Sequence, residues 1–378
     1  MNFPKSNRFF CLLLCLCTLI VYSNSFENAF QYDDYHVIVN NPYIKDPVGI
    51  PQFFVDPKMG SGLLKDSGSY RPLLMITFGL NYAMGGLNVF GYHLANFVLH
   101  VLCALLVYFL VLFFLQNTIM ERGAGSIENQ MAALLAALIF AVHPVQTESV
   151  TYITGRSSSL ITFFFLASFL AYVHYGDNGR KAYLAFSAAS YGAALLVKEA
   201  AVTLPVILFF YGWLFPRGRT WKRRILSMIP HLLLSAVYLG ARVHFFGLKD
   251  SSTPIRPLKE QILTQLNAWV HNLQTLLFPL HLNVDYDFPI AHSILEGRVL
   301  LSILILSAVA LVIWKISKAI RPVAFFAIWF AVTLAPTSSI VPLKDVVADR
   351  WLYLPSVGYA AILAMVADWL FRTAPMLA

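Results

Sequence analysis

Long apolar segments recur along the whole chain and constrain its fold more than any other feature. A helix needs roughly 20 mostly apolar residues to cross a bilayer, and fewer where neighbouring helices or a thinned bilayer help. Hydrophobic residues make up 58% of the sequence and charged residues 12%, a composition far from that of a soluble domain. We therefore predict an all-α integral membrane protein with about ten spans. They lie at 9–23, 93–116, 131–142, 157–175, 182–197, 201–215, 225–246, 298–315, 322–341 and 353–371.

Basic residues predict how these spans are oriented, because Lys and Arg are enriched in short cytoplasmic loops. With both termini in the cytoplasm, the dense cluster Arg217-Arg219-Lys222-Arg223-Arg224 lies on that side, beside a span. Lipid headgroups are the expected partners of such a cluster. The net charge of +8 is then a topology signal, and we expect no nucleic-acid partner. The other cytoplasmic basic residues are Lys5, Arg8, Arg122, Arg180, Lys181, Lys315, Lys318, Arg321 and Arg372.

The first span resembles a signal peptide, with Lys5 and Arg8 ahead of the apolar stretch 11–21. We expect it to stay as an uncleaved anchor, because no small-x-small cleavage site follows. The chain has no Asn-x-Ser/Thr glycosylation acceptor, which favours a bacterial inner membrane over the endoplasmic reticulum membrane. No external disulfide is predicted, because all four cysteines lie within predicted spans: Cys11, Cys15, Cys17 and Cys103.

Two external segments, 24–92 and 247–297, are too long to be simple connections. The first carries an acidic motif and then the amphipathic run 70–82, which we predict to be a juxtamembrane helix with Pro72 in its first turn. The second offers a similar helix at 260–278. No internal helical repeat is visible, so residues 1–378 are predicted to form one membrane domain without a repeat domain.

Charged and polar residues gather on the predicted outer face. Asp33 and Asp34 follow the first span, and acids held close to a bilayer are costly unless something uses them. A solvated acidic loop is the alternative, since loops commonly contain Asp. The same face receives Arg71, His143, Glu148, Arg156, Lys198, Glu199, Asp349 and Arg350.

Transfer of a sugar from a lipid-phosphate carrier needs this mixture of side chains. Negative charge grows on the departing phosphate, so cations must meet it. The acceptor hydroxyl is a poor nucleophile at neutral pH, and a carboxylate must accept its proton. We predict Asp33 or Asp34 as that base, Arg156, Lys198, Arg350 and Arg71 as donor-phosphate contacts, and His143, Glu148, Glu199 and Asp349 as supporting residues.

Each assignment has a structural alternative. His143 precedes a proline and could simply end a helix. Arg156 could be a snorkelling flank of its span. The neighbours Lys198-Glu199 and Asp349-Arg350 could be local ion pairs. Adjacent acids could also bind Mg²⁺ or Mn²⁺, but no further acidic cluster accompanies them, so we expect no required cofactor and keep a divalent cation as the alternative.

Six motifs occur in a fixed order along nearly the whole chain. They are Tyr32-Asp33-Asp34 with Asn40-Asn41-Pro42; Tyr70-Arg71-Pro72-Leu73; Gly91-Tyr92-His93-Leu94-Ala95-Asn96 through His100; His143-Pro144 with Thr147-Glu148-Ser149-Val150 and Gly155-Arg156; Lys198-Glu199; and Asp349-Arg350-Trp351-Leu352-Tyr353-Leu354-Pro355. In this order they resemble the membrane half of the transmembrane and tetratricopeptide-repeat O-mannosyltransferases and their bacterial relatives.

The resemblance implies a GT-C glycosyltransferase that uses a polyprenyl-phosphate sugar and usually inverts the anomeric centre. It places Asp33 and Asp34 in the acidic motif that includes the catalytic base, and Arg156 at the donor phosphate. Family members with helical repeats use them to engage protein acceptors, whereas this chain stops at Ala378. The acceptor is therefore expected to be a protein or a glycan.

The sequence thus predicts a membrane glycosyltransferase that acts on the non-cytoplasmic face, with a polyprenyl-phosphate sugar and membrane lipids as partners. The alternative is a transporter or flippase of lipid-linked sugars, which would bind phosphate without needing an external base. Transporters tend to place ionisable residues near the midplane and to show repeated halves. Here the ionisable residues gather at one face and repeated halves are not evident, which favours the enzyme.

Overall fold

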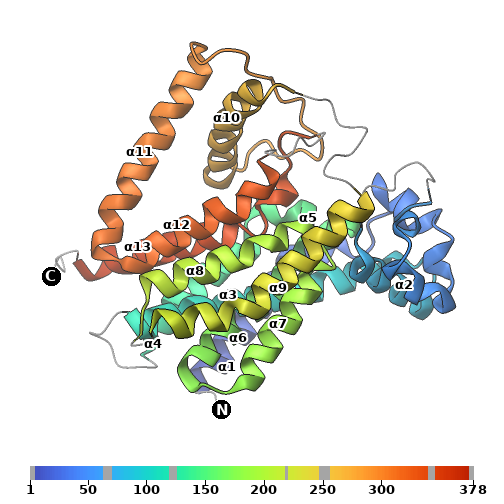
Figure 1. Cartoon of the computed structure of the whole chain (residues 1–378), viewed down its shortest axis with the longest axis horizontal. Helices are drawn as coiled ribbons and strands as arrows, with labels where there is room; N and C mark the ends of the chain where they lie inside the picture. The colour runs from blue at the N-terminus through green and yellow to red at the C-terminus, as the bar shows by residue number, and fades with distance from the viewer. Residues whose placement is uncertain are drawn as a thin grey trace.

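The computed structural model describes residues 5–62, 70–118, 126–217, 220–246, 256–338 and 345–373, and the regular elements in these ranges are all helical. Most of the α-helices form a bundle of roughly parallel rods, from which α10 and α11 project (Figure 1). They are α1 (Lys5–Tyr22), α2 (Pro72–Gly85), α3 (Val89–Thr118), α4 (Ile127–Val142), α5 (Thr147–Thr151), α6 (Arg156–Asn178), α7 (Lys181–Leu195), α8 (Leu204–Leu214), α9 (Trp221–Phe246), α10 (Leu258–Leu277), α11 (Gly297–Ala319), α12 (Arg321–Leu334) and α13 (Ser356–Thr373).

The all-α membrane class is confirmed, but the expected ten spans are not. Among the described residues, five helices are long and apolar enough to cross a membrane: α1, α3, α6, α9 and α11. A sixth is possible if α4 and the segment Pro144–Thr151, bent by 51°, form one broken span. The other expected spans fall on helices that are too short or too charged. α7 has 15 residues, which rise only about 22 Å, and α13 carries Asp368 and Arg372.

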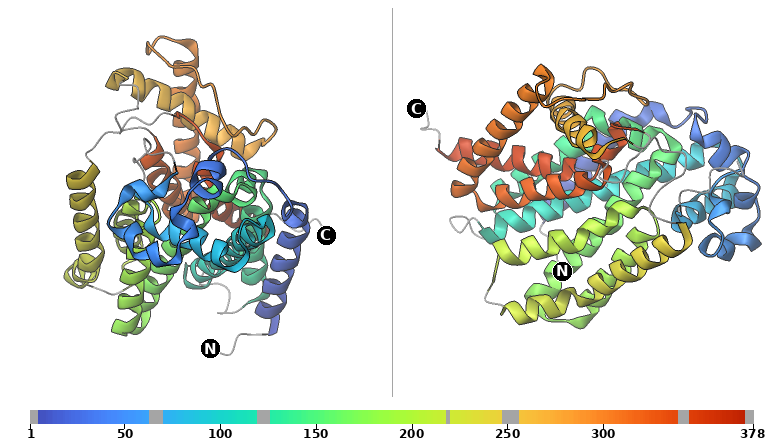
Figure 2. Two further views of the ribbon diagram at one scale, coloured as in Figure 1. Left: turned by 90° about the vertical axis from the view of Figure 1, so that its right-hand side faces the viewer. Right: turned by 45° about the horizontal axis from the view of Figure 1, so that its top comes forward.

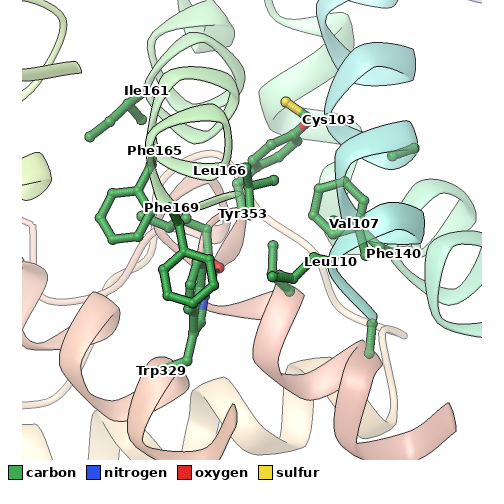
Figure 3. Packing of buried hydrophobic residues seen from close by; sticks show 14 of the residues in the cluster. Cys103, Val107, Leu110, Phe140, Ile161, Phe165, Leu166, Phe169, Trp329 and Tyr353 are labelled. Carbon is green, nitrogen blue, oxygen red and sulfur yellow. Dashed lines mark hydrogen bonds between the residues drawn. The ribbon is translucent and has the colours of Figure 1, made fainter. Parts of the chain in front are cut away.

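The bundle core lies where α3, α4, α6, α12 and α13 meet. Phe165 and Phe169 of α6 point toward Trp329 of α12, with ring centroids 5.2 and 5.6 Å apart (Figure 3). His100 of α3 also belongs to the core, because its Nε2 donates to the Ala141 carbonyl and its Nδ1 accepts from the Tyr353 hydroxyl. Packing of aromatic rings and interhelical hydrogen bonds thus hold the core together.

The first external loop folds into short helical turns at one end of the bundle, where Figures 1 and 2 both place it with α2. α2 starts at Pro72, as predicted, and ends at Gly85. The next residue, Gly86, has a positive φ of 59°, which favours glycine. The loop's turns are η1 (Ser23–Ser25), the π-helical η2 (Tyr35–Val39), η3 (Tyr43–Lys45), η4 (Pro47–Phe54) and η5 (Pro57–Gly60). α2 packs on η3, η4 and α3, so the loop is attached to the bundle.

The second long loop contains α10, which matches the helix expected at 260–278. α11 follows it and contacts α10 at one end and α12 at the other, standing away from the other helices (Figure 1). Only 11% of the apolar stretch of α11 is buried inside the protein, so most of this helix faces outward. That exposure fits a surface that lipid covers.

Candidate active site

A cavity of about 770 Å³ lies where the first loop meets the ends of the helices. One part of its wall is apolar and comes from α8, α9 and α12, through Val206, Leu239, Val243 and Val332. The other part is charged. It is lined by Asp33, His36, Arg71, Lys198, Glu199, Arg242 and Arg350. The cavity therefore combines a surface for hydrocarbon with a surface for an anion.

The two adjacent aspartates occupy different environments. Asp34 is 1% exposed, and its carboxylate oxygens accept hydrogen bonds from the backbone N–H groups of Gln31 (3.0 Å) and Thr154 (2.9 Å). Burial raises the pKa of Asp34, although these hydrogen bonds oppose the shift. The Asp33 side chain is 62% exposed and lines the cavity. Asp34 thus fastens the first loop to the segment before α6, while Asp33 is available to a substrate.

The backbone around Asp33 is strained and braced. Tyr32, the residue before it, has a φ of 42°, a left-handed conformation that costs a bulky side chain about 1–2 kcal/mol. The Asp33 N–H donates to the Tyr152 hydroxyl at 2.9 Å, and the rings of Tyr32 and Tyr152 meet edge to face. Strain of this kind persists where surrounding contacts over-determine the backbone, which is common at functional sites.

Lys198 and Arg71 lie side by side in the cationic part of the cavity wall. Lys198 lies between α7 and the short helix η8 (Glu199–Thr203), and the Leu73 N–H donates to the Leu196 carbonyl, which brings the start of α2 beside it. Lys198 is only 8% exposed, and its Nζ has no hydrogen-bond or ion-pair partner among the described residues. Burial and the charge of Arg71 lower the pKa of Lys198 to about 7, although Glu199 opposes them. A lysine on the cavity wall whose Nζ has no hydrogen-bond partner in the described residues is suited to bind an anion.

Arg350 also lines the cavity, but Glu148 and Asp345 share its charge. Its Nη1 and backbone N–H donate to the two Glu148 carboxylate oxygens at 2.5 and 2.7 Å, and its Nη2 donates to Asp345 at 3.2 Å. The Ser158 hydroxyl holds the Arg350 carbonyl at 3.0 Å. Glu148 therefore holds Arg350 in place and leaves it a weaker anion contact than Lys198.

Like Glu148, the predicted supporting residues Asp349 and His143 lie outside the cavity lining. Asp349 accepts hydrogen bonds from the Tyr286 hydroxyl and the Asn283 N–H, so it anchors the second long loop, and its burial raises its pKa to about 6. His143 donates from Nε2 to the Leu276 carbonyl and accepts at Nδ1 from the Val145 N–H. Both residues connect the second loop to the bundle.

The resemblance places Arg156 at the donor phosphate, but Arg156 does not line the cavity. It is fully buried, with its guanidinium carbon 4.7 Å from the centre of the Phe78 ring. Its N–H groups donate to the Asn96 side chain (2.6 Å), the Thr77 hydroxyl (3.1 Å) and the Tyr92 carbonyl (2.9 Å). The protein itself thus uses Arg156 to join α2, α3 and α6.

We predict that Arg156→Lys mainly destabilises the protein. A lysine cannot reproduce the planar fork of the guanidinium, so buried acceptors lose their donors at a cost of about 1–3 kcal/mol each. The midpoint of thermal unfolding in detergent should fall, while donor affinity measured below that temperature stays near that of the unmodified protein. A stable variant with strongly reduced donor affinity would instead assign Arg156 to the donor phosphate.

Two cavity residues, His36 and Arg242, were not predicted from the sequence. Arg242 lies in the last turns of α9, within a candidate span, and a charge inside an apolar helix is itself a signal for function. His36 follows Asp33 by three residues, a spacing that places two side chains on one side of a helical turn. Within the described ranges, no group of three His, Cys, Asp or Glu side chains could hold a metal ion, and a reaction without a cofactor stays a prediction.

No protein-family model and no solved structure matches the chain, but curated proteins do. It is 28% identical to Protein O-mannosyl-transferase Tmtc3 of Drosophila melanogaster, over 96% of this chain and 46% of that protein. It is 27% identical to the human proteins TMTC3, over 91% of this chain and 40% of that protein, and TMTC1, over 95% and 45%. The chain therefore spans less than half the length of these three relatives.

These relatives are eukaryotic, so they do not favour the bacterial inner membrane that the missing glycosylation acceptor predicted. The apolar helices agree with a multi-pass membrane protein. The similarity extends over more than nine-tenths of this chain. Over most of its length the chain is thus similar to the transmembrane and tetratricopeptide-repeat O-mannosyltransferases.

Proposed function

We propose that this chain is a GT-C glycosyltransferase that moves a sugar from a polyprenyl-phosphate donor to an acceptor hydroxyl, with inversion at the anomeric carbon. One observation carries the proposal. The same cavity presents an exposed carboxylate, Asp33, a largely buried lysine, Lys198, whose Nζ has no hydrogen-bond partner in the described residues, and an apolar wall. The reaction needs all three: a base for the acceptor, a cation for the phosphate and a surface for the isoprenoid.

The donor phosphate would bind at Lys198 and Arg71, with Arg242 as a third cation of the same wall. Charge-assisted hydrogen bonds to such groups contribute about 1.5–3 kcal/mol each. Their effect on rate is largest as the bond to the sugar breaks, because the phosphate oxygen then gains negative charge. The first isoprene units would lie on the apolar wall formed by α8, α9 and α12.

The acceptor would be activated by Asp33 in a single displacement. The acceptor oxygen attacks the anomeric carbon from the side opposite the phosphate, the bond from that carbon to the phosphate oxygen breaks, and the acceptor proton passes to the Asp33 carboxylate. Asp34 is almost fully buried, and Glu199 has the cations Lys198 and Arg71 as neighbours. Asp33 is exposed, so it is the carboxylate that an acceptor can reach. One available carboxylate suffices for an inverting reaction.

The side of action is inferred from charge. Arg217, just after α8, and Lys222, Arg223 and Arg224, at the start of α9, belong to the basic cluster. These ends of α8 and α9 lie at the end of the bundle away from the first loop (Figure 1). If that cluster is cytoplasmic, the cavity faces the other side of the membrane. The names of the relatives state protein O-mannosyl transfer, and we propose the same chemistry here: mannose as the sugar and a protein hydroxyl as the acceptor.

The proposal is tested with the purified full chain in lipid nanodiscs. We expect a polyprenyl phosphate to be identified by mass spectrometry in lipid extracts of the protein, and mannose from polyprenyl-phosphate mannose to appear on a serine- or threonine-containing peptide. Movement of the intact donor between leaflets without transfer would support the transporter instead. If neither transfer nor a bound polyprenyl phosphate is found, the proposed activity is wrong.

A further inference from the structure

His36 makes a direct contact with the proposed base. Its Nε2 lies 3.2 Å from Oδ1 of Asp33, and its Nδ1 lies 3.0 Å from the Ser61 hydroxyl oxygen. Both Asp33 and His36 line the cavity. The contact thus joins two side chains that a substrate would meet together.

The partners of His36 determine the positions of its protons. An ionised carboxylate only accepts hydrogen bonds, so Nε2 carries the hydrogen and donates to Asp33. In a neutral ring Nδ1 is then an acceptor, and the Ser61 hydroxyl donates to it. This arrangement fixes one carboxylate oxygen, Oδ1, and leaves Oδ2 for a different partner.

The backbone brings these three residues together. η2 is a π turn in which the Asn40 N–H donates to the Tyr35 carbonyl at 2.7 Å, and single π turns are frequent at functional sites. The Gly62 N–H donates to the His36 carbonyl at 2.7 Å, which keeps Ser61 beside the imidazole. A Cβ on Gly62 would lie 2.6 Å from the Asn40 carbonyl oxygen, so this close approach requires glycine.

We propose that His36 is a positioning residue for the glycosyl transfer: it holds Oδ1 of Asp33 so that Oδ2 faces the acceptor hydroxyl. The inference rests on the proposed function. The acceptor proton passes to Oδ2, and His36 keeps its own proton throughout. An exposed aspartate otherwise samples several rotamers, and a displacement of about 1 Å from the productive geometry can cost about 10²-fold in rate.

Two near-isosteric variants test this role. The amide nitrogen of His36→Gln can replace Nε2 and donate to Asp33, whereas His36→Asn replaces Nδ1 and reaches only Ser61. We expect kcat to fall about 10- to 100-fold in His36→Asn, with an unchanged KM for the donor, and to stay within about 3-fold of wild type in His36→Gln. Equal kcat values in both variants, or a loss confined to KM, would overturn the inference.

Failure of the inference and failure of the proposed function give different results. If Asp33→Asn is inactive while His36→Asn behaves like wild type, Asp33 remains the general base, and the positioning role of His36 is wrong. If Asp33→Asn retains full turnover, the base itself is wrong. A third measurement needs no turnover: imidazole ¹⁵N shifts in histidine-labelled protein should show His36 protonated at Nε2, and this signal should change in Asp33→Asn. A proton on Nδ1 alone would overturn the arrangement.

Discussion

Asp33→Asn is expected to lower kcat by about 10²- to 10⁴-fold, the range that a positioned general base contributes. The amide has the same shape as the carboxylate but cannot accept the acceptor proton at neutral pH. Donor binding should persist, because the cations that would hold the phosphate, Lys198 and Arg71, are unchanged. Single-turnover transfer from radiolabelled polyprenyl-phosphate mannose separates the two quantities.

Asp34→Asn is the matched comparison for this prediction. Asp34 accepts two backbone hydrogen bonds and is almost fully buried, so one oxygen of the carboxylate becomes a misplaced amide donor in the variant. We expect a lower unfolding temperature and less folded protein, with turnover per folded molecule reduced far less than in Asp33→Asn. Asp287→Asn, on the exposed part of the second loop, serves as the control with no effect. Loss of turnover only in Asp34→Asn would exchange the roles of the two acids.

The sequence predicted those parts of the fold that local signals determine. The proline at the first position of α2 and the amphipathic pattern of α10 lie within the helices themselves, and both helices occur. The predicted span count is not confirmed, for the opposite reason. A helix such as α7 is apolar but short, and whether it crosses the membrane depends on neighbours that lie elsewhere in the chain.

Contacts between distant segments decided which predicted site residues meet. Asp34 differs from Asp33 because Thr154, 120 residues away, donates to it. The Arg156 guanidinium donates its hydrogen bonds to Asn96 and Thr77, which lie 60 and 79 residues earlier in the chain. Neither distinction is encoded near the residue concerned, because burial is a property of the packed bundle. Chemistry alone could name the candidate acids and cations, but only the fold separates those that line a cavity from those that hold it together.

Replacement of Lys198 is the second change with a large expected effect. Lys198→Met removes the unpartnered ammonium from the cavity wall, and the affinity for the donor should fall about 10- to 100-fold, as for the loss of one charge-assisted hydrogen bond. The variant should fold normally, because methionine matches the length of the lysine stem and a buried charge is removed. Lys259→Met, exposed at the start of α10, is the control.

The pH dependence gives a sharper test of Lys198. Its pKa of about 7 lies below that of an ordinary lysine, so the free site is mostly protonated below pH 7 and mostly neutral above it. A phosphate anion binds the protonated form, and therefore kcat/KM for the donor should decline as pH rises above about 7, by up to tenfold per pH unit. Lys198→Arg keeps a charge that does not titrate in this range, so it should retain donor binding and lose the alkaline decline. An unchanged decline in Lys198→Arg would mean that another group titrates, and that the unpartnered ammonium does not bind the donor phosphate.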